Sequence, residues 1–284
     1  MKKYISSLLA AALSASTLTA LESPITESTT ISSSETINSP LIVRNPEGKF
    51  VQLKILGSGT VLTSNYSGSD YAIDLKASTQ LVIEDGGGLN ITTSGSGVAI
   101  RSGASMLVNN VVGKIEMAKV VLFGSKLTIK SENAFSCGKT GTTLMLVSNG
   151  SYMELAASQS FNKMDIRANS TIKFSDGVTL NFKDIDITNS ASKIDVVLED
   201  FSNTNSIYFG SASGLSLTDG VLTVSKSDKS IDYTFKDKAG EIMKNLVLDA
   251  KTNTLTLASI PEPSTYAAVF GALALGLALY RRRK

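Results

Sequence analysis

Two carboxylates lie two residues apart in the most acidic stretch of the chain, where Asp184 and Asp186 flank Ile185. Side chains alternate between the two faces of a strand. If Ile185 and Ile187 point inward, both carboxylates therefore point outward, about 7 Å apart. A carboxylate pair at this spacing has the chemistry to hold Ca²⁺ or to act in a glycosidase or lyase site. Carboxylates on the solvent face of a strand also serve solubility alone, so both interpretations stay open.

A polysaccharide lyase of this kind needs further acids and a basic side chain near the pair. Asp195 is the next candidate acid along the chain, and Arg167 and Lys183 are the nearest candidate bases. We treat Asp184, Asp186 and Asp195 as a speculative acidic face. We assign no catalytic residue, no metal and no cofactor.

The composition excludes several common kinds of chemistry. The chain has no histidine, so it cannot build a Ser-His-Asp triad, a Cys-His pair or a histidine metal site. Its single cysteine, Cys137, excludes an intramolecular disulfide. It also lacks tryptophan, which sugar-binding clefts commonly use as a stacking platform. These absences favour a protein that is not an enzyme.

The elements that must position the acids are short strands. Many short apolar runs are separated by Gly, Ser, Asn and Asp, and several alternate with period two, as in Ile194, Val196 and Leu198. No proline occurs between Pro46 and Pro261, which suits a sheet in which almost every backbone N–H is needed for pairing. The pattern predicts an all-β fold.

A loose repeat underlies these strands. Small residues precede an apolar strand at serines 78, 105, 125, 151, 170 and 192, with spacings of 27, 20, 26, 19 and 22 residues. Repeats of this length, with small residues at the corners, fit the coils of a right-handed parallel β-helix, or solenoid. The Gly124-Ser125-Lys126-Leu127-Thr128-Ile129 segment resembles coils of autotransporter-passenger and adhesin-like β-solenoids. A β-sandwich is the alternative.

The N-terminus has the features of a secretory signal peptide. Lys2 and Lys3 supply the positive region, an apolar stretch runs from Ile5 to Leu13, and small residues follow up to Ala20. We therefore expect residues 1–20 to be removed. Residues 21–40 are rich in Ser and Thr, which predicts a flexible segment before the folded domain.

The C-terminus carries a second hydrophobic segment. A Pro-Glu-Pro triad precedes an apolar run from Tyr266 to Tyr280, which covers about 22 Å as a helix and so spans a bilayer only with help from its flanks. The terminal cations are expected to stay cytoplasmic. The triad consists of Pro261, Glu262 and Pro263, and the basic stop consists of Arg281, Arg282, Arg283 and Lys284.

This order of triad, short apolar helix and basic stop resembles the PEP-CTERM sorting signal of Gram-negative bacteria that make extracellular polysaccharide. The resemblance implies that an exosortase, a membrane protease-transpeptidase, processes the tail. It implies transient insertion in the inner membrane through a helix at about residues 264–280, followed by release to the cell surface or matrix. An ordinary C-terminal anchor is the alternative.

The charge of the chain depends on its ends. Without Lys2, Lys3 and the four terminal cations, 21 of the 27 basic residues remain against 25 acidic ones, a net charge of −4. Nothing forms a basic stripe, so we expect no nucleic-acid partner.

The sequence thus predicts four parts. They are a signal peptide (1–20), a flexible segment (21–40), a β-helix ectodomain (41–259) and a PEP-CTERM signal (260–284) whose basic tail is 281–284. We expect an exported structural protein of the cell surface or biofilm matrix. Its expected partners are the general secretion machinery, an exosortase and extracellular polysaccharide. The alternatives are a polysaccharide-degrading enzyme and a glycan-binding adhesin.

Overall fold

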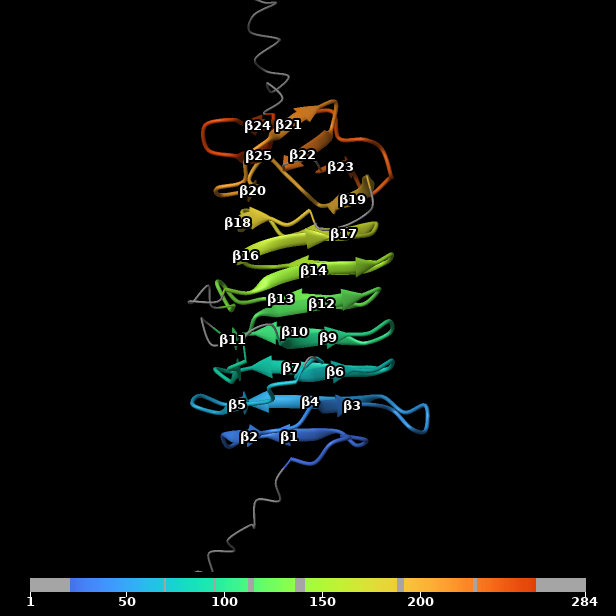
Figure 1. Cartoon of the computed structure of the whole chain (residues 1–284), viewed down its shortest axis with the longest axis vertical. Helices are drawn as coiled ribbons and strands as arrows, with labels where there is room; N and C mark the ends of the chain where they lie inside the picture. The colour runs from blue at the N-terminus through green and yellow to red at the C-terminus, as the bar shows by residue number, and fades with distance from the viewer. Residues whose placement is uncertain are drawn as a thin grey trace, which may run out of the picture.

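The computed structural model describes residues 21–258, apart from 69, 94–95, 112–114, 136–140, 188–191 and 227–228. Every regular element in these residues is a β-strand. The strands stack along one axis as a β-solenoid of about seven coils, with residue 21 near one end and the last strands at the other (Figure 1). The prediction of an all-β solenoid is confirmed.

Three sheets form the walls of the solenoid. Sheet B contains β1 (Thr29–Ile31), β4 (Val51–Leu56), β7 (Thr79–Glu84), β10 (Ser105–Asn109), β13 (Lys126–Ile129), β15 (Ser151–Leu155), β17 (Ser170–Phe174), β19 (Lys193–Glu199), β23 (Lys229–Lys236), β22 (Val221–Lys226) and β21 (Leu215–Thr218). Sheet A contains β3 (Leu41–Val43), β6 (Ile73–Leu75), β9 (Gly97–Ile100), β12 (Lys119–Phe123), β14 (Thr143–Ser148), β16 (Gln159–Ile166), β18 (Thr179–Ile185), β20 (Ser206–Tyr208), β25 (Thr254–Leu257) and β24 (Leu246–Asp249). Sheet C contains β2 (Glu35–Ile37), β5 (Val61–Ser64), β8 (Gly88–Ile91) and β11 (Ile115–Glu116).

The chain visits the sheets in a fixed order. Each early coil runs through sheet B, then C, then A, as in β4, β5 and β6. Each of these strands pairs in parallel with the strand at the equivalent position of the next coil. From β13 onward the parallel coils have two strands, as in β15 and β16. Because a β-sandwich is built from antiparallel sheets, these parallel ladders exclude that alternative.

Apolar side chains at matching positions fill the interior. One column in sheet B joins neighbours in register through six coils and is fully or almost fully buried: Leu53, Leu81, Met106, Leu127, Met153 and Ile172. Each such side chain contributes about 1.5–3 kcal/mol through burial. The inward column therefore provides much of the driving force that stacks one coil on the next.

Aromatic rings fill the interior where sheet C ends. The rings of Phe135 and Phe161 lie 5.2 Å apart, and those of Phe161 and Phe182 lie 6.0 Å apart. Phe209 continues the column at 6.5 Å from Phe182. These distances suit offset aromatic pairs, which add to the burial of each ring.

The segment expected to be flexible, residues 21–40, instead contributes to the first coil. Strand β1 pairs with β4, and strand β2 pairs with β5. Ile25, Ile31 and Ile37 are buried, while the Ser and Thr residues between them lie mostly at the surface. The prediction of a flexible segment is therefore wrong, because three isoleucines are enough to join the core when β4 and β5 supply the neighbouring strands.

The last strands change direction. Strands β21, β22 and β23 form an antiparallel unit, and β24 and β25 form a second one that pairs with β20. Asp219 and Gly220 connect β21 to β22 with positive φ angles of 48° and 78°, as a two-residue type I′ turn requires. We call residues 215–257 the C-terminal cap. The parallel coils thus end before residue 259, the predicted boundary.

Candidate functional site

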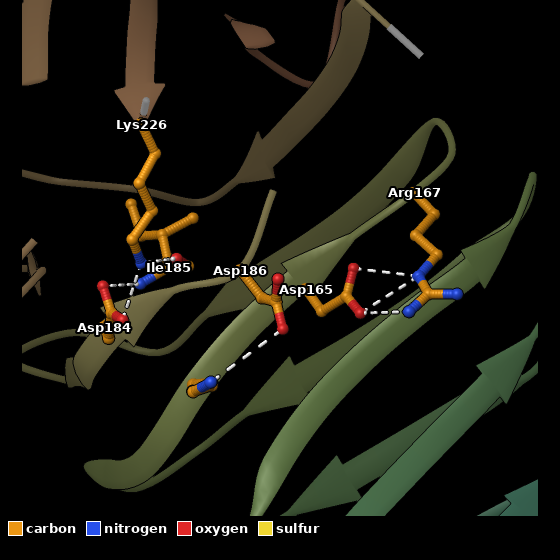
Figure 2. A network of polar contacts seen from close by, with 7 residues as sticks. Asp165, Arg167, Asp184, Ile185, Asp186 and Lys226 are labelled. Atoms are coloured by element: carbon orange, nitrogen blue, oxygen red, sulfur yellow. Dashed lines mark hydrogen bonds and ion pairs between the residues drawn. The ribbon is translucent and has the colours of Figure 1, made fainter. Parts of the chain in front are cut away.

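Asp184 and Asp186 occupy the outer face of sheet A, as the alternation predicted. Ile185 and Ile187 are buried, so the two acids at the end of β18 point outward. Asp184 Oδ2 lies 2.8 Å from Nζ of Lys226, which comes from the C-terminal cap (Figure 2). Asp186 Oδ2 lies 4.0 Å from Nζ of Lys163 on β16. Each carboxylate is therefore neutralised by a lysine of another strand.

Asp195 lies on a different wall of the solenoid. It belongs to β19 in sheet B, whereas Asp184 belongs to sheet A. Its Oδ2 lies 2.6 Å from Nζ of Lys236 on the adjacent strand β23. The three acids therefore do not form one acidic face.

Arg167, the candidate base, is engaged by a carboxylate that the sequence reasoning passed over. Its Nε lies 3.0 Å from each carboxylate oxygen of Asp165, and its Nη2 lies 2.6 Å from Oδ2 (Figure 2). The Asp165 side chain is only 3% exposed. The hydrogen bonds that Arg167 donates to this carboxylate raise the pKa of Arg167, although burial of the guanidinium opposes the rise. The pair holds both residues in a fixed, neutral arrangement.

A second ion pair, which is partly buried, lies farther along sheet A. Asp74 on β6 accepts hydrogen bonds from Arg101 Nε at 2.9 Å and from Lys76 Nζ at 2.6 Å. The Arg101 guanidinium also lies 4.4 Å from the ring centre of Phe123 and 5.4 Å from that of Tyr71. Burial favours the neutral acid, but the hydrogen bonds from the two cations outweigh it and lower the pKa of Asp74.

A signal for this pair was present in the chain. Asp74 and Arg101 are 27 residues apart, which is one coil of the repeat. A charged residue therefore meets its partner one coil later along the same face. Reading charges along the repeat would have found it.

These geometries favour structural ion pairs over an acid–base site. General acid–base catalysis needs a proton donor and acceptor placed on either side of a substrate bond. Here the carboxylates of sheet A are directed at cations of the same coil, as in Asp165 and Arg167, or of another coil, as in Asp74 and Arg101. Within the described residues no group of three or more His, Cys, Asp or Glu side chains is arranged to hold a metal ion.

The sorting motif and basic stop, Pro261 to Pro263 and Arg281 to Lys284, lie outside the described residues, as do the signal peptide and Cys137. Within the part of the chain that the structure describes, no helix is long and apolar enough to cross a membrane.

The architecture defines the class of protein as a β-solenoid. No protein-family model and no curated protein matches the chain.

Proposed function

We propose that this protein is an exported structural component of the cell surface or extracellular matrix, delivered as a right-handed β-solenoid. The signal peptide at residues 1–20 directs secretion, and a helix at about 264–280 holds the chain briefly in the inner membrane. An exosortase then processes the tail at the Pro261-Glu262-Pro263 motif. The released ectodomain associates with extracellular polysaccharide.

The C-terminal tail is the observation that carries this proposal. Its triad, apolar run and basic stop occur in the order and at the end that the PEP-CTERM signal requires. The two prolines keep the residues before the apolar run extended, which is the form a protease binds. The two predicted targeting segments lie outside the domain that builds the coils, so their removal leaves the core columns intact.

The solenoid supports a structural role. Its coils repeat the same inward columns, so the fold extends along one axis (Figure 1). The right hand assigned to it follows the strong preference of crossover connections between parallel strands. A rod of this kind offers long, flat faces to a surrounding matrix rather than a deep cleft.

The sorting step is tested by replacing Pro261, Glu262 and Pro263 with alanine. We expect the variant to accumulate at full length in the inner membrane, whereas the wild type is recovered from the surface with a shortened C-terminus. The matched control replaces Pro46 and Glu47, the same dipeptide in an exposed turn of the ectodomain, and should be sorted normally. Mass spectrometry of both termini reads out the result. Equal processing of the triad variant and the wild type would contradict the proposal.

We infer no enzymatic activity for the ectodomain. The support is that Asp184 and Asp186, the best candidate acids, each face a lysine. Release of reducing ends or unsaturated products from acidic polysaccharides, with and without Ca²⁺, measures the alternative. Activity that disappears in a variant with both Asp184→Ala and Asp186→Ala would establish an enzyme.

A further inference from the structure

An open depression lies on the outer face of sheet B beside the C-terminal cap. It has a volume of about 320 Å³ and is lined by six residues. They are Asn169, Lys193, Asp195, Thr234, Lys236 and Ile242. Asp195 and Thr234 stand directly opposite each other on β19 and β23, so the floor of the depression is the junction between the last parallel coil and the cap.

The depression carries a local excess of positive charge. Lys236 Nζ lies 2.6 Å from Asp195 Oδ2, so these two charges compensate each other. Lys193 is exposed and has no ion-pair partner among the residues that the structure describes. One unit of positive charge therefore remains, on a chain whose net charge without its targeting segments is −4.

A buried hydroxyl points to a missing partner at this place. Thr234 is only 2% exposed, and its Oγ1 has no hydrogen-bond partner within the described part of the chain. Buried polar groups are almost always hydrogen-bonded, so an unpaired one at the floor of a depression indicates a site that a ligand or water completes. Asn169 adds a donor, because its Oδ1 accepts the Asp195 backbone N–H and leaves its amide NH₂ group for other partners.

We propose that this depression binds an anionic group, a carboxylate or a sulfate, of an acidic polysaccharide. The Lys193 ammonium supplies the charge, and the Thr234 hydroxyl and the Asn169 amide supply hydrogen bonds. Lys236 remains paired with Asp195 and fixes the floor. The assignment rests on the proposed export into a polysaccharide matrix and names the chemistry of the partner.

A second depression on the same face explains why the ligand is a polymer. It has a volume of about 250 Å³ and is lined in part by Lys126, Thr128, Lys130 and Glu154. Lys126 Nζ is paired with Glu154 at 2.7 Å, and Lys130 supplies a further cation, as Lys193 does in the first depression. Strands β13 and β19 are three steps apart in sheet B, about 14 Å. A linear polyanion reaches both depressions, whereas a single small anion reaches one.

The test measures binding of the full chain, purified in a non-ionic detergent, to three polymers by calorimetric titration. Polygalacturonate carries carboxylates, dextran sulfate carries sulfates, and dextran is neutral. We expect binding to at least one charged polymer that weakens with added salt, and none to dextran. Preference for polygalacturonate assigns a carboxylate, and preference for dextran sulfate assigns a sulfate. Binding to neither, or equal binding to dextran, overturns the proposal.

Two variants localise the site. Lys193→Gln should weaken binding about tenfold, the loss expected for one charge-assisted contact. Thr234→Val, which keeps the shape of the side chain, should weaken it about threefold or more. Lys49→Gln is the matched control, because it removes the same charge from an exposed side chain that lines neither depression, and it should bind like the wild type.

Equal affinities of Lys193→Gln and Lys49→Gln overturn the assignment, and if Thr234→Val misfolds, this comparison still decides the question. The outcome is also separable from the proposed sorting. A chain that binds acidic polymers but is not processed refutes the sorting alone, and a chain that is processed but does not bind refutes the site alone.

Discussion

Gln159 provides the sharpest test of how the solenoid is held together where its shape changes. Its side chain is fully buried at the start of β16. The Oε1 atom accepts the backbone N–H of Ala134 at 3.0 Å, and Nε2 donates to the carbonyl oxygen of Ser131. Both partners lie in the preceding coil, which follows the last strand of sheet C, β11. One amide therefore satisfies two backbone groups that no strand of sheet C pairs.

Replacing Gln159 with Leu keeps the size of the side chain but removes both bonds. Each buried backbone group left without a partner costs about 1–3 kcal/mol. Because the glutamine amide no longer has to leave water, about 1–2 kcal/mol of this cost is recovered. For the two groups together we expect a net loss of about 1–4 kcal/mol in the free energy of unfolding.

The assay is equilibrium unfolding in urea at pH 7, with the slope compared between variants to check that the cooperative unit is unchanged. Gln52→Leu is the matched control, because Gln52 donates to Gln80 at 2.8 Å on the outer face, where water replaces the lost bond. It should cost no more than about 1 kcal/mol. If Gln159→Leu is no more destabilising than Gln52→Leu, the buried amide does not hold the coils as we argue.

Two further predictions concern ionisation. Tyr233 is fully buried, its hydroxyl has no partner among the described residues, and burial raises its pKa. Tyr233→Phe should therefore stabilise the protein by about 1 kcal/mol at pH 7, and should reduce the loss of stability above about pH 10, where only the unfolded tyrosine ionises. In acid, the lowered pKa of Asp74 means that its ion pair stabilises the fold above about pH 4 and is lost as the pH falls through the folded value. Urea midpoints should decline below about pH 4, and Asp74→Asn should flatten that decline. A decline of the same size in Asp74→Asn, or a destabilised Tyr233→Phe, would show that these environments are assigned wrongly.

The register of the solenoid was predictable because small residues, mostly serines, recur at its corners. Ser125, Ser151 and Ser170 occupy one buried column at the start of their strands, as the spacing predicted. Ser125 and Ser151 donate to the carbonyl oxygens of Ile100 and Leu122 in the previous coil. A small side chain fits there, and a serine hydroxyl also bonds to the previous coil, so the repeat remains visible in the sequence. At Ser78 and Ser105 the column is taken instead by the neighbouring Thr79 and Ala104.

The two ends of the fold were harder to predict. In residues 21–40, short strands place Ser and Thr outward, so the composition indicates a flexible segment although the isoleucines are core. At the other end, the repeat gives no sign that the parallel coils stop. Asp219-Gly220 is the strongest kind of short hairpin signal, and here the hairpin is formed.

The candidate site could not be derived from spacing along the chain alone. Asp184 and Asp195 are close in sequence but lie on different walls, because the chain changes sheets between β18 and β19. Conversely, Asp195 meets Lys236, 41 residues later, because β23 is the neighbour of β19 in sheet B although β20, β21 and β22 lie between them in the chain. Pairing across coils thus decides which charges are neutralised, and it leaves Lys193 unpaired among the described residues.

The cap also determines how the two proposals fit together in space. Residue 258 follows directly on β25, so the proposed anchor leaves the solenoid from the capped end, while β1 lies at the opposite end (Figure 1). The depression at Lys193 lies nearer to the capped end, and the one at Lys130 lies farther from it along sheet B. The edge strands β1 and β2 at this end are short. The charges of Glu27, just before β1, and Glu35, in β2, oppose edge-to-edge pairing with a second copy of the chain. Because the two depressions lie on different strands of sheet B, a polysaccharide that occupies both would run parallel to the solenoid axis.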